Sequence, residues 1–133
     1  MESSVVFFPC DDLEKTRAFY LQVVGMRLYR DFGNCILLDS GHGYLGFVAY
    51  GDGRPNGTGA CISFNCSSQA EVDREYERLM ARIPDRIKGP PQKQGGFPVY
   101  SFFFEDPNGY QLEFQKIQAE PLEQAGKNGT ASF

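Results

Sequence analysis

Apolar and polar side chains alternate most regularly near the end of the chain. Residues 101–105 are rich in phenylalanine, and residues 110–114 place an apolar side chain at every second position. A period of two is typical of a half-buried strand. Residues 106–109, between the two runs, read Asp-Pro-Asn-Gly, which favours a type I turn. The pattern therefore predicts a hairpin whose second strand buries one face and presents Gln111, Glu113 and Gln115 on the other.

Two segments instead have the three- and four-residue spacing of apolar positions that indicates an amphipathic helix. The first is expected to follow a cap at Asp11 and to end at Gly25. The second is expected to follow a cap at Ser68 and to end at Pro84. Strands are predicted at residues 5–8, 26–31, 35–38 and 45–50 in the first half, and at 60–64, near 87, at 101–105 and at 110–114 in the second.

The order of strand, helix and three strands thus occurs twice, which indicates an internal duplication. We expect a single domain over residues 1–118, with modules at about 4–51 and 59–117, followed by a flexible tail at 119–133. The closing strands of the modules align when Gly43–Tyr44 is matched with Gly109–Tyr110. The second module is the longer one, and the loop at 89–98, rich in Pro and Gly, is the expected place of the insertion.

Composition and charge narrow the classes of function. The 133 residues include 13 basic and 17 acidic side chains, which gives a net charge of −4. This balance argues against nucleic-acid binding and mildly favours a neutral or cationic ligand. No stretch is long and apolar enough to span a membrane, and no signal peptide is apparent. The four cysteines have neither metal-ligand nor disulfide spacing, so we expect reduced thiols in a cytoplasmic protein.

Two stretches of the sequence carry a family resemblance. Residues 12–20, followed by Val24 and Gly25, and the hairpin residues 106–114 resemble motifs of the glyoxalase / bleomycin-resistance / extradiol-dioxygenase superfamily, also called vicinal oxygen chelate proteins. The resemblance extends over residues 4–117. It implies an α+β fold of two tandem βαβββ modules with curled mixed sheets, and commonly a homodimer. This fold serves lyases, isomerases, dioxygenases and drug-binding proteins, so it does not settle the function.

The resemblance also implies where a metal would be held. Enzymes of the family place ligands at up to four inward positions, which correspond here to Val5, Phe47, Cys61 and Glu113. Only Glu113 keeps a ligand type of the family, although Cys61 offers a thiolate to a soft metal. The only histidine, His42, lies in a Gly-rich turn and is expected to be solvated. Because a catalytic zinc or iron site needs about three protein ligands, we expect no metal or other cofactor, with a divalent ion as the less favoured alternative.

Alternation along the strands predicts which side chains line the cup between the sheets. One half would be aromatic and the other polar with a single acid, which is the usual composition of a small-molecule pocket. Such a pocket suits a flat or cationic organic ligand. The predicted ligand-binding residues are Phe7, Phe47, Cys61, Ser63, Gln111 and Glu113. Cys61 is expected to be buried as a small apolar residue. In the alternative interpretation, the apolar side chains fill the cup and leave no cavity.

Three functions remain open from the sequence. The first is a binding protein, resembling the bleomycin-resistance branch, that sequesters a small organic ligand without a metal. The second is a metal-dependent lyase or oxygenase of the glyoxalase or dioxygenase type, with a degenerate or dimer-shared site. The third is a metal-free enzyme in which Glu113, desolvated by Phe47, acts as a general base. The lost ligand positions favour the first.

Overall fold

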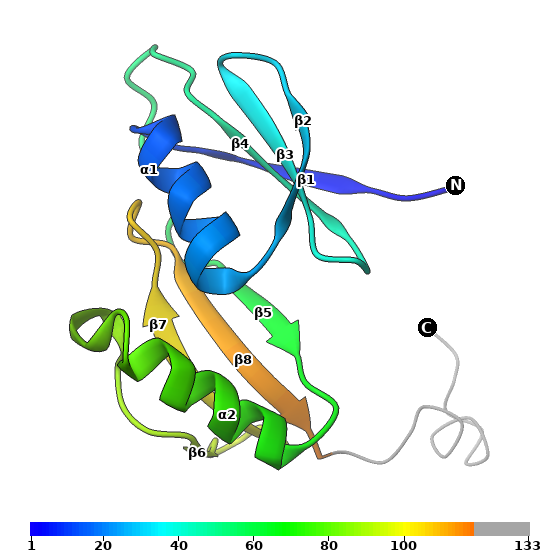
Figure 1. Ribbon diagram of the computed structural model, residues 1–133, viewed down its shortest axis with the longest axis vertical. Helices are drawn as coiled ribbons and strands as arrows, with labels where there is room; N and C mark the ends of the chain where they lie inside the picture. The colour runs from blue at the N-terminus through cyan, green and yellow to red at the C-terminus, as the bar shows by residue number, and fades with distance from the viewer. Residues whose placement is uncertain (119–133) are drawn as a thin grey trace.

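Two four-stranded mixed sheets, each accompanied by a helical segment, make up the chain in the computed structural model (Figure 1). This is the predicted α+β arrangement of two βαβββ modules. The structure describes residues 1–118, and the predicted tail at 119–133 lies outside the described residues. Among the helices that are described, none has the length and apolar character needed to cross a membrane.

The first module forms a sheet with the strand order β1-β4-β3-β2. Its elements are β1 (Val5–Pro9), α1 (Leu13–Ala18), a π-helical continuation η1 (Phe19–Val24), β2 (Arg27–Asp31), β3 (Cys35–Asp39) and β4 (Tyr44–Val48). Strand β1 runs parallel to β4, and the other neighbours are antiparallel. Gly25 ends the helix with a φ of 96°, as predicted. The cap is Asp12 rather than Asp11, because the Asp12 carboxylate is the one that accepts the Lys15 N–H, at 3.0 Å.

The second module repeats this order as β5-β8-β7-β6. Its elements are β5 (Cys61–Asn65), α2 (Gln69–Met80), a 3₁₀ turn η2 (Pro84–Arg86), β6 (Gln92–Lys93), β7 (Val99–Glu105) and β8 (Gln111–Ile117). Ser68 caps α2 as predicted, since its Oγ accepts the Glu71 N–H at 3.1 Å. The strand expected near residue 87 is only a single bridge from Ile87 to Phe104. Strand β6 lies inside the segment that was predicted to be a loop.

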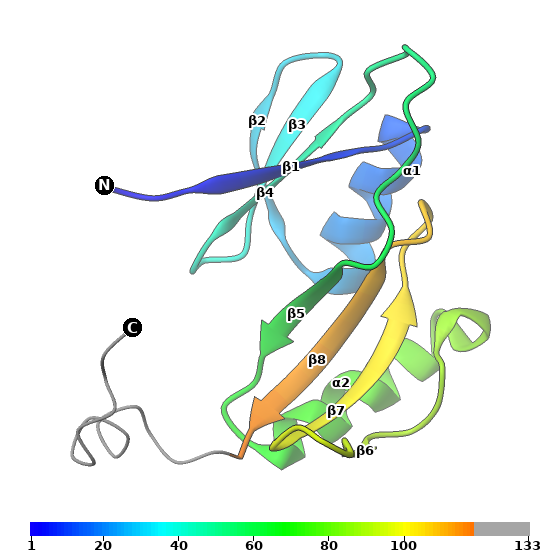
Figure 2. The same ribbon diagram turned by 180° about the vertical axis from the view of Figure 1, so that it is seen from behind.

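Both sheets carry their helices on the same side, so their other faces are open on the opposite side of the molecule (Figure 2). The π-helical segment η1 contacts both modules. Tyr20 packs on Phe47 of the first sheet with ring centroids 4.7 Å apart, and Phe19 packs on Phe104 of the second at 6.5 Å. These aromatic contacts give the two modules one shared apolar core.

The predicted hairpin turn adds a polar connection between the modules. The turn is closed by Gly109, whose N–H donates to the Asp106 carbonyl at 3.0 Å. The fully buried Asp106 carboxylate accepts the Tyr20 hydroxyl at 2.8 Å. Burial and this carboxylate raise the pKa of Tyr20 far above its ordinary value, so the hydroxyl remains a donor. Arg82, in the turn after α2, adds a charged contact, because it donates to the Gln22 carbonyl at 2.8 Å, near the C-terminal end of η1.

Candidate functional site

The open face of the second sheet holds a carboxylate that solvent hardly reaches. Glu113 of β8 is only 7% exposed, although it lies on the face away from α2. Its direction follows from alternation, because Leu112 and Phe114 on either side belong to the core. Within the sheet Glu113 pairs with Ser63 of β5 and with Phe103 of β7. The sequence predicted the face of Glu113 correctly but not its burial.

One oxygen of the Glu113 carboxylate is held by its neighbours. Ser63 Oγ donates to Oε1 at 2.5 Å, and the Cys61 thiol lies 3.9 Å from the same atom. No group within residues 1–118 donates to Oε2. Ser63 has used its only proton and keeps lone pairs that can accept a further hydrogen bond. The pair therefore presents acceptors to a ligand that brings a positive charge or hydrogen-bond donors.

Amide and hydroxyl groups surround this carboxylate on the same face. Gln115 donates from Nε2 to Asn65 Oδ1 at 2.9 Å, and Gln111 pairs with Cys61 at the other end of the strands. Ser101 of β7, opposite Gln115, is fully buried, and its Oγ is a buried polar atom without a partner in the described chain. Such an orphaned hydroxyl is unusual in folded proteins. The sequence analysis missed Ser101 because the Phe-rich run around it hides the alternation.

The first sheet has an aromatic ring at the corresponding place. Pairing of β1 with β4 puts Phe7 beside Gly46, just as pairing of β5 with β8 puts Ser63 beside Glu113. The Phe7 ring lies over Gly46, since a Cβ on this glycine would come within 2.5 Å of Phe7 Cδ1. Phe7 is 46% exposed. The open face of the first sheet thus offers an aromatic surface where the second offers an acid.

The prediction that Phe47 lies on the open face is wrong. Its side chain is fully buried on the helix side of β4. The rings around it are those of Phe8, Tyr20 and Tyr110. Matching Gly43 with Gly109 made Phe47 the counterpart of Glu113, whereas the strand pairing makes Gly46 the counterpart. A shift of one residue moves a side chain to the other face of a sheet. Phe47 therefore neither lines the cup nor desolvates Glu113.

The side chains on the open faces do not fit the metal site that the resemblance implies. With Gly46 in place of Phe47, the four ligand positions include Val5 and a glycine, neither of which has a donor side chain. Within residues 1–118, no three His, Cys, Asp or Glu side chains lie close enough to hold an ion. Burial and the nearby Glu113 carboxylate raise the pKa of Cys61, which disfavours the thiolate that a metal requires.

The cysteines are all free thiols, in agreement with the expected absence of disulfides. Cys10 and Cys66 are buried, and burial with the nearby acids Glu71 and Glu75 raises the pKa of Cys66 to about 11. Cys61, however, is exposed, contrary to the prediction. The reason is its position as the first residue of β5, an edge strand, with its side chain on the open face.

Comparison with known proteins gives a consistent family and fold. The sequence model of the Glyoxalase/Bleomycin resistance protein/Dioxygenase superfamily matches residues 4–114. A crystal structure of a glyoxalase/bleomycin resistance protein/dioxygenase from Nocardioides has a TM-score of 0.74 at 20% identity, covering 91% of this chain and 86% of that one. Lactoylglutathione lyase from Agrobacterium tumefaciens has a TM-score of 0.65 at 20% identity, covering 84% and 90%. TioX from Micromonospora sp. ML1 has a TM-score of 0.68 at 19% identity, covering 88% and 99%. No curated protein sequence matches the chain.

Proposed function

The chain belongs to the Glyoxalase/Bleomycin resistance protein/Dioxygenase superfamily, and from this premise we propose that it is a cytoplasmic binding protein for a small organic ligand. The ligand occupies the open face of the sheets and is sequestered unchanged, as in the bleomycin-resistance branch. It is held by side chains alone, without a metal or another cofactor. Neither a nucleic acid nor a membrane is a partner in this proposal.

The observation that carries the proposal is the buried carboxylate of Glu113 on the open face of the second sheet. A carboxylate withdrawn from water loses solvation, and the hydrogen bond from Ser63 and the weak one from the Cys61 thiol replace only part of it. A ligand with an ammonium, amidinium or similar cationic group would restore a full set of donors and would gain a charge-assisted hydrogen bond. The exposed ring of Phe7, at the matching place of the first sheet, supports a ligand that also has a flat apolar part.

A homodimer would complete this site. The open faces of the two sheets lie on the same side of one chain, so neither sheet covers the other (Figure 2). Aromatic side chains on the first sheet stay exposed there, with Phe7 at 46% and Tyr29 at 42%. A second copy placed against this side would bury these rings and would enclose a ligand at Glu113.

A metal-free enzyme is the second candidate. The low exposure of Glu113 and the absence of a described donor on its Oε2 are also what a general base requires. The two functions differ in the fate of the ligand, because a binding protein returns it unchanged whereas an enzyme returns a product. Mass spectrometry of the bound compound after incubation with the protein distinguishes them.

We expect the purified protein to carry far less than one transition-metal ion per chain, because only Cys61 and Glu113 retain donor atoms at the four family positions. The measurement is inductively coupled plasma mass spectrometry on protein produced in medium supplemented with zinc, iron and manganese. One ion per chain that disappears in both Cys61→Ser and Glu113→Gln would contradict the metal-free site. It would instead favour a lyase or oxygenase whose remaining ligands come from a second copy.

Replacement of Glu113 by glutamine should weaken the binding of a cationic aromatic probe such as benzylamine by at least about tenfold, since the charge is lost while the shape is kept. The amide oxygen of Gln can still accept the Ser63 hydroxyl, so the fold should persist. The dissociation constant is measured by ligand-observed NMR. Glu14→Gln, an exposed acid in the first turn of α1, is the matched control and should leave the affinity unchanged. Equal affinity in both variants would remove Glu113 from the site.

A further inference from the structure

A hollow of about 600 Å³ lies where the two modules meet, directly beside the Glu113 site. Its volume is in the range of small-molecule sites. The end of the first helix, the turn between β3 and β4, and strand β5 with the residues after it form its walls. Ser63 belongs both to this hollow and, through its hydrogen bond to the carboxylate, to the Glu113 site, so the two sites adjoin at this residue. A ligand anchored at Glu113 can therefore extend into it.

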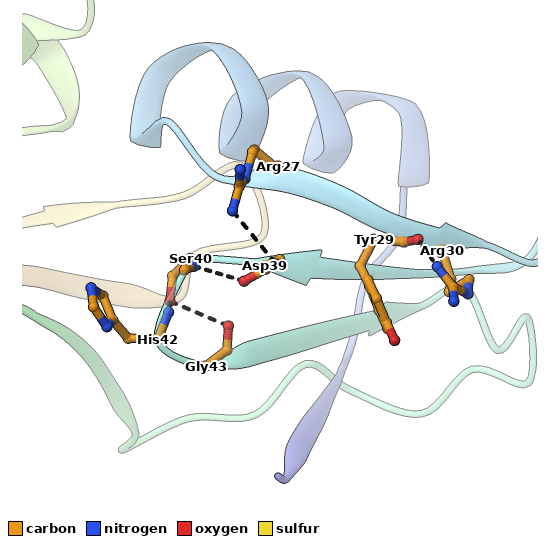
Figure 3. A network of polar contacts seen from close by, with 8 residues as sticks. Arg27, Tyr29, Arg30, Asp39, Ser40, His42 and Gly43 are labelled. Atoms are coloured by element: carbon orange, nitrogen blue, oxygen red, sulfur yellow. Dashed lines mark hydrogen bonds and ion pairs between the residues drawn. The ribbon is translucent and has the colours of Figure 1, made fainter. Parts of the chain in front are cut away.

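The turn between β3 and β4 is fixed by its own hydrogen bonds and presents His42 to the hollow (Figure 3). Asp39 accepts the Gly41 N–H at 2.7 Å and lies 3.8 Å from the Arg27 guanidinium. Ser40 donates to the Gly43 carbonyl at 3.2 Å and accepts the His42 N–H at 3.3 Å. In Figure 3 the imidazole of His42 points out of the turn, away from these contacts. The sequence analysis expected His42 to be merely a solvated turn residue, and it is exposed.

The polar groups left free on this side of the hollow are hydrogen-bond donors. No residue between 1 and 118 forms a hydrogen bond with the imidazole of His42. Asn65 uses its Oδ1 to accept from Gln115, which leaves its Nδ2 to donate. Ser67, by contrast, is occupied, because both its N–H and its hydroxyl donate to Glu71. An imidazole and an amide N–H₂ together suit a carboxylate or another anionic group.

Apolar side chains form another part of the wall of this hollow. Met26 and Phe114, which are 6% and 8% exposed, line the hollow together with Val24 and Phe64. Because Phe64 and Phe114 alternate with Ser63 and Glu113, they belong to the helix face of the sheet and border the hollow on the side away from the acid.

We infer that the ligand is a small zwitterion, with its cationic group at Glu113 and Ser63 on the open face of the second sheet and its anionic group at His42 and Asn65 in the adjoining hollow. The cationic end of this inference rests on the proposed function. The anionic end rests only on the hollow and on the free donors of His42 and Asn65. The assignments of the cationic end and of the anionic end can therefore fail separately.

Three simple probes separate the two ends: benzylamine carries only the cation, benzoate only the anion, and 4-(aminomethyl)benzoate both. His42 is the only histidine of the chain, so its imidazole proton resonances are identified by their loss in His42→Ala. The zwitterion should bind about tenfold more tightly than benzylamine and should shift these resonances. His42→Ala should abolish the advantage of the zwitterion over benzylamine. Asn34→Ala, in the exposed turn before β3, is the control and should retain it.

The outcomes distinguish this inference from the proposed function. If benzylamine binds in a Glu113-dependent way but the carboxylate adds no affinity, or adds the same affinity in His42→Ala, the inference is wrong and the proposed function stands. If benzoate shifts the His42 resonances while no probe depends on Glu113, the anionic end stands and the proposed function is wrong. If the His42 resonances respond to neither carboxylate, the hollow is not the ligand site.

Discussion

Asp106→Ala should destabilise the protein by about 3–5 kcal/mol, because it leaves several buried donors without an acceptor. The Asp106 carboxylate is fully buried and accepts the Tyr20 hydroxyl and the backbone N–H groups of Asn108 and Tyr110, each at 2.8 Å. It thereby holds the turn before β8 and ties this turn to the helix of the other module. Urea unfolding followed by circular dichroism measures the loss, which corresponds to a fall in Tm of roughly 10–20 °C.

Two further variants test the origin of this loss. Tyr20→Phe removes one donor but leaves Asp106 its backbone hydrogen bonds, so it should cost only about 1–2 kcal/mol. The double variant should lose less stability than the sum of the two single losses, because both single variants remove the same hydrogen bond between Tyr20 and Asp106. Asp52→Ala, which removes an exposed partner of Arg54, is the surface control and should change the midpoint only slightly. A loss in Asp106→Ala no greater than in the Asp52 variant would contradict the role of Asp106.

The sequence predicted those elements whose side chains show a clear period. Strand β8 alternates strictly, so the faces of Leu112 and Glu113 followed from it. Strand β4 is almost wholly apolar, so its sequence shows no alternation of apolar and polar side chains. The alignment of the two modules could therefore be wrong by one residue, which placed Phe47 on the wrong face. Strand β6 has two polar residues, and its pairing with β7 runs through the main chain, which leaves no trace in the side-chain pattern. The Asp12 cap was missed because two aspartates stand side by side before the helix.

The candidate site was less predictable because it depends on contacts between distant residues. Tyr20 and Asp106 are 86 positions apart, and Ser63 and Glu113 are 50 apart, so only the fold brings them together. The sequence could assign Glu113, Ser63, Gln111 and Phe7 to the open faces by alternation within single strands. It could not show that the turn carrying His42 lies across a hollow from β5, because this depends on how the two modules meet.

Phe47→Ala should also destabilise the fold by about 3–5 kcal/mol, since a fully buried ring at the junction of three aromatic neighbours is replaced by a cavity. The nearest ring, that of Tyr20, lies 4.7 Å away between centroids and also carries the hydrogen bond to Asp106. Loss of Phe47 therefore loosens the contact through which the helix joins the modules. Urea unfolding gives the free energy, and the effect should be far larger than that of any change on the open face.

Phe7→Ala is the matched control, because it removes the same ring from the other face of the same sheet. Phe7 is 46% exposed, so its loss should cost less than about 1.5 kcal/mol. Ligand binding, unlike stability, should depend on Phe7 rather than on Phe47. Phe7→Ala should weaken a cationic aromatic probe several-fold, whereas Phe47→Leu, which refills most of the cavity, should leave its affinity unchanged. Two results together would contradict this arrangement: weaker binding in Phe47→Leu, and a Phe47→Ala variant that unfolds no more easily than Phe7→Ala. Phe47 would then lie on the ligand face, and the strand pairing of β1 with β4 would be wrong.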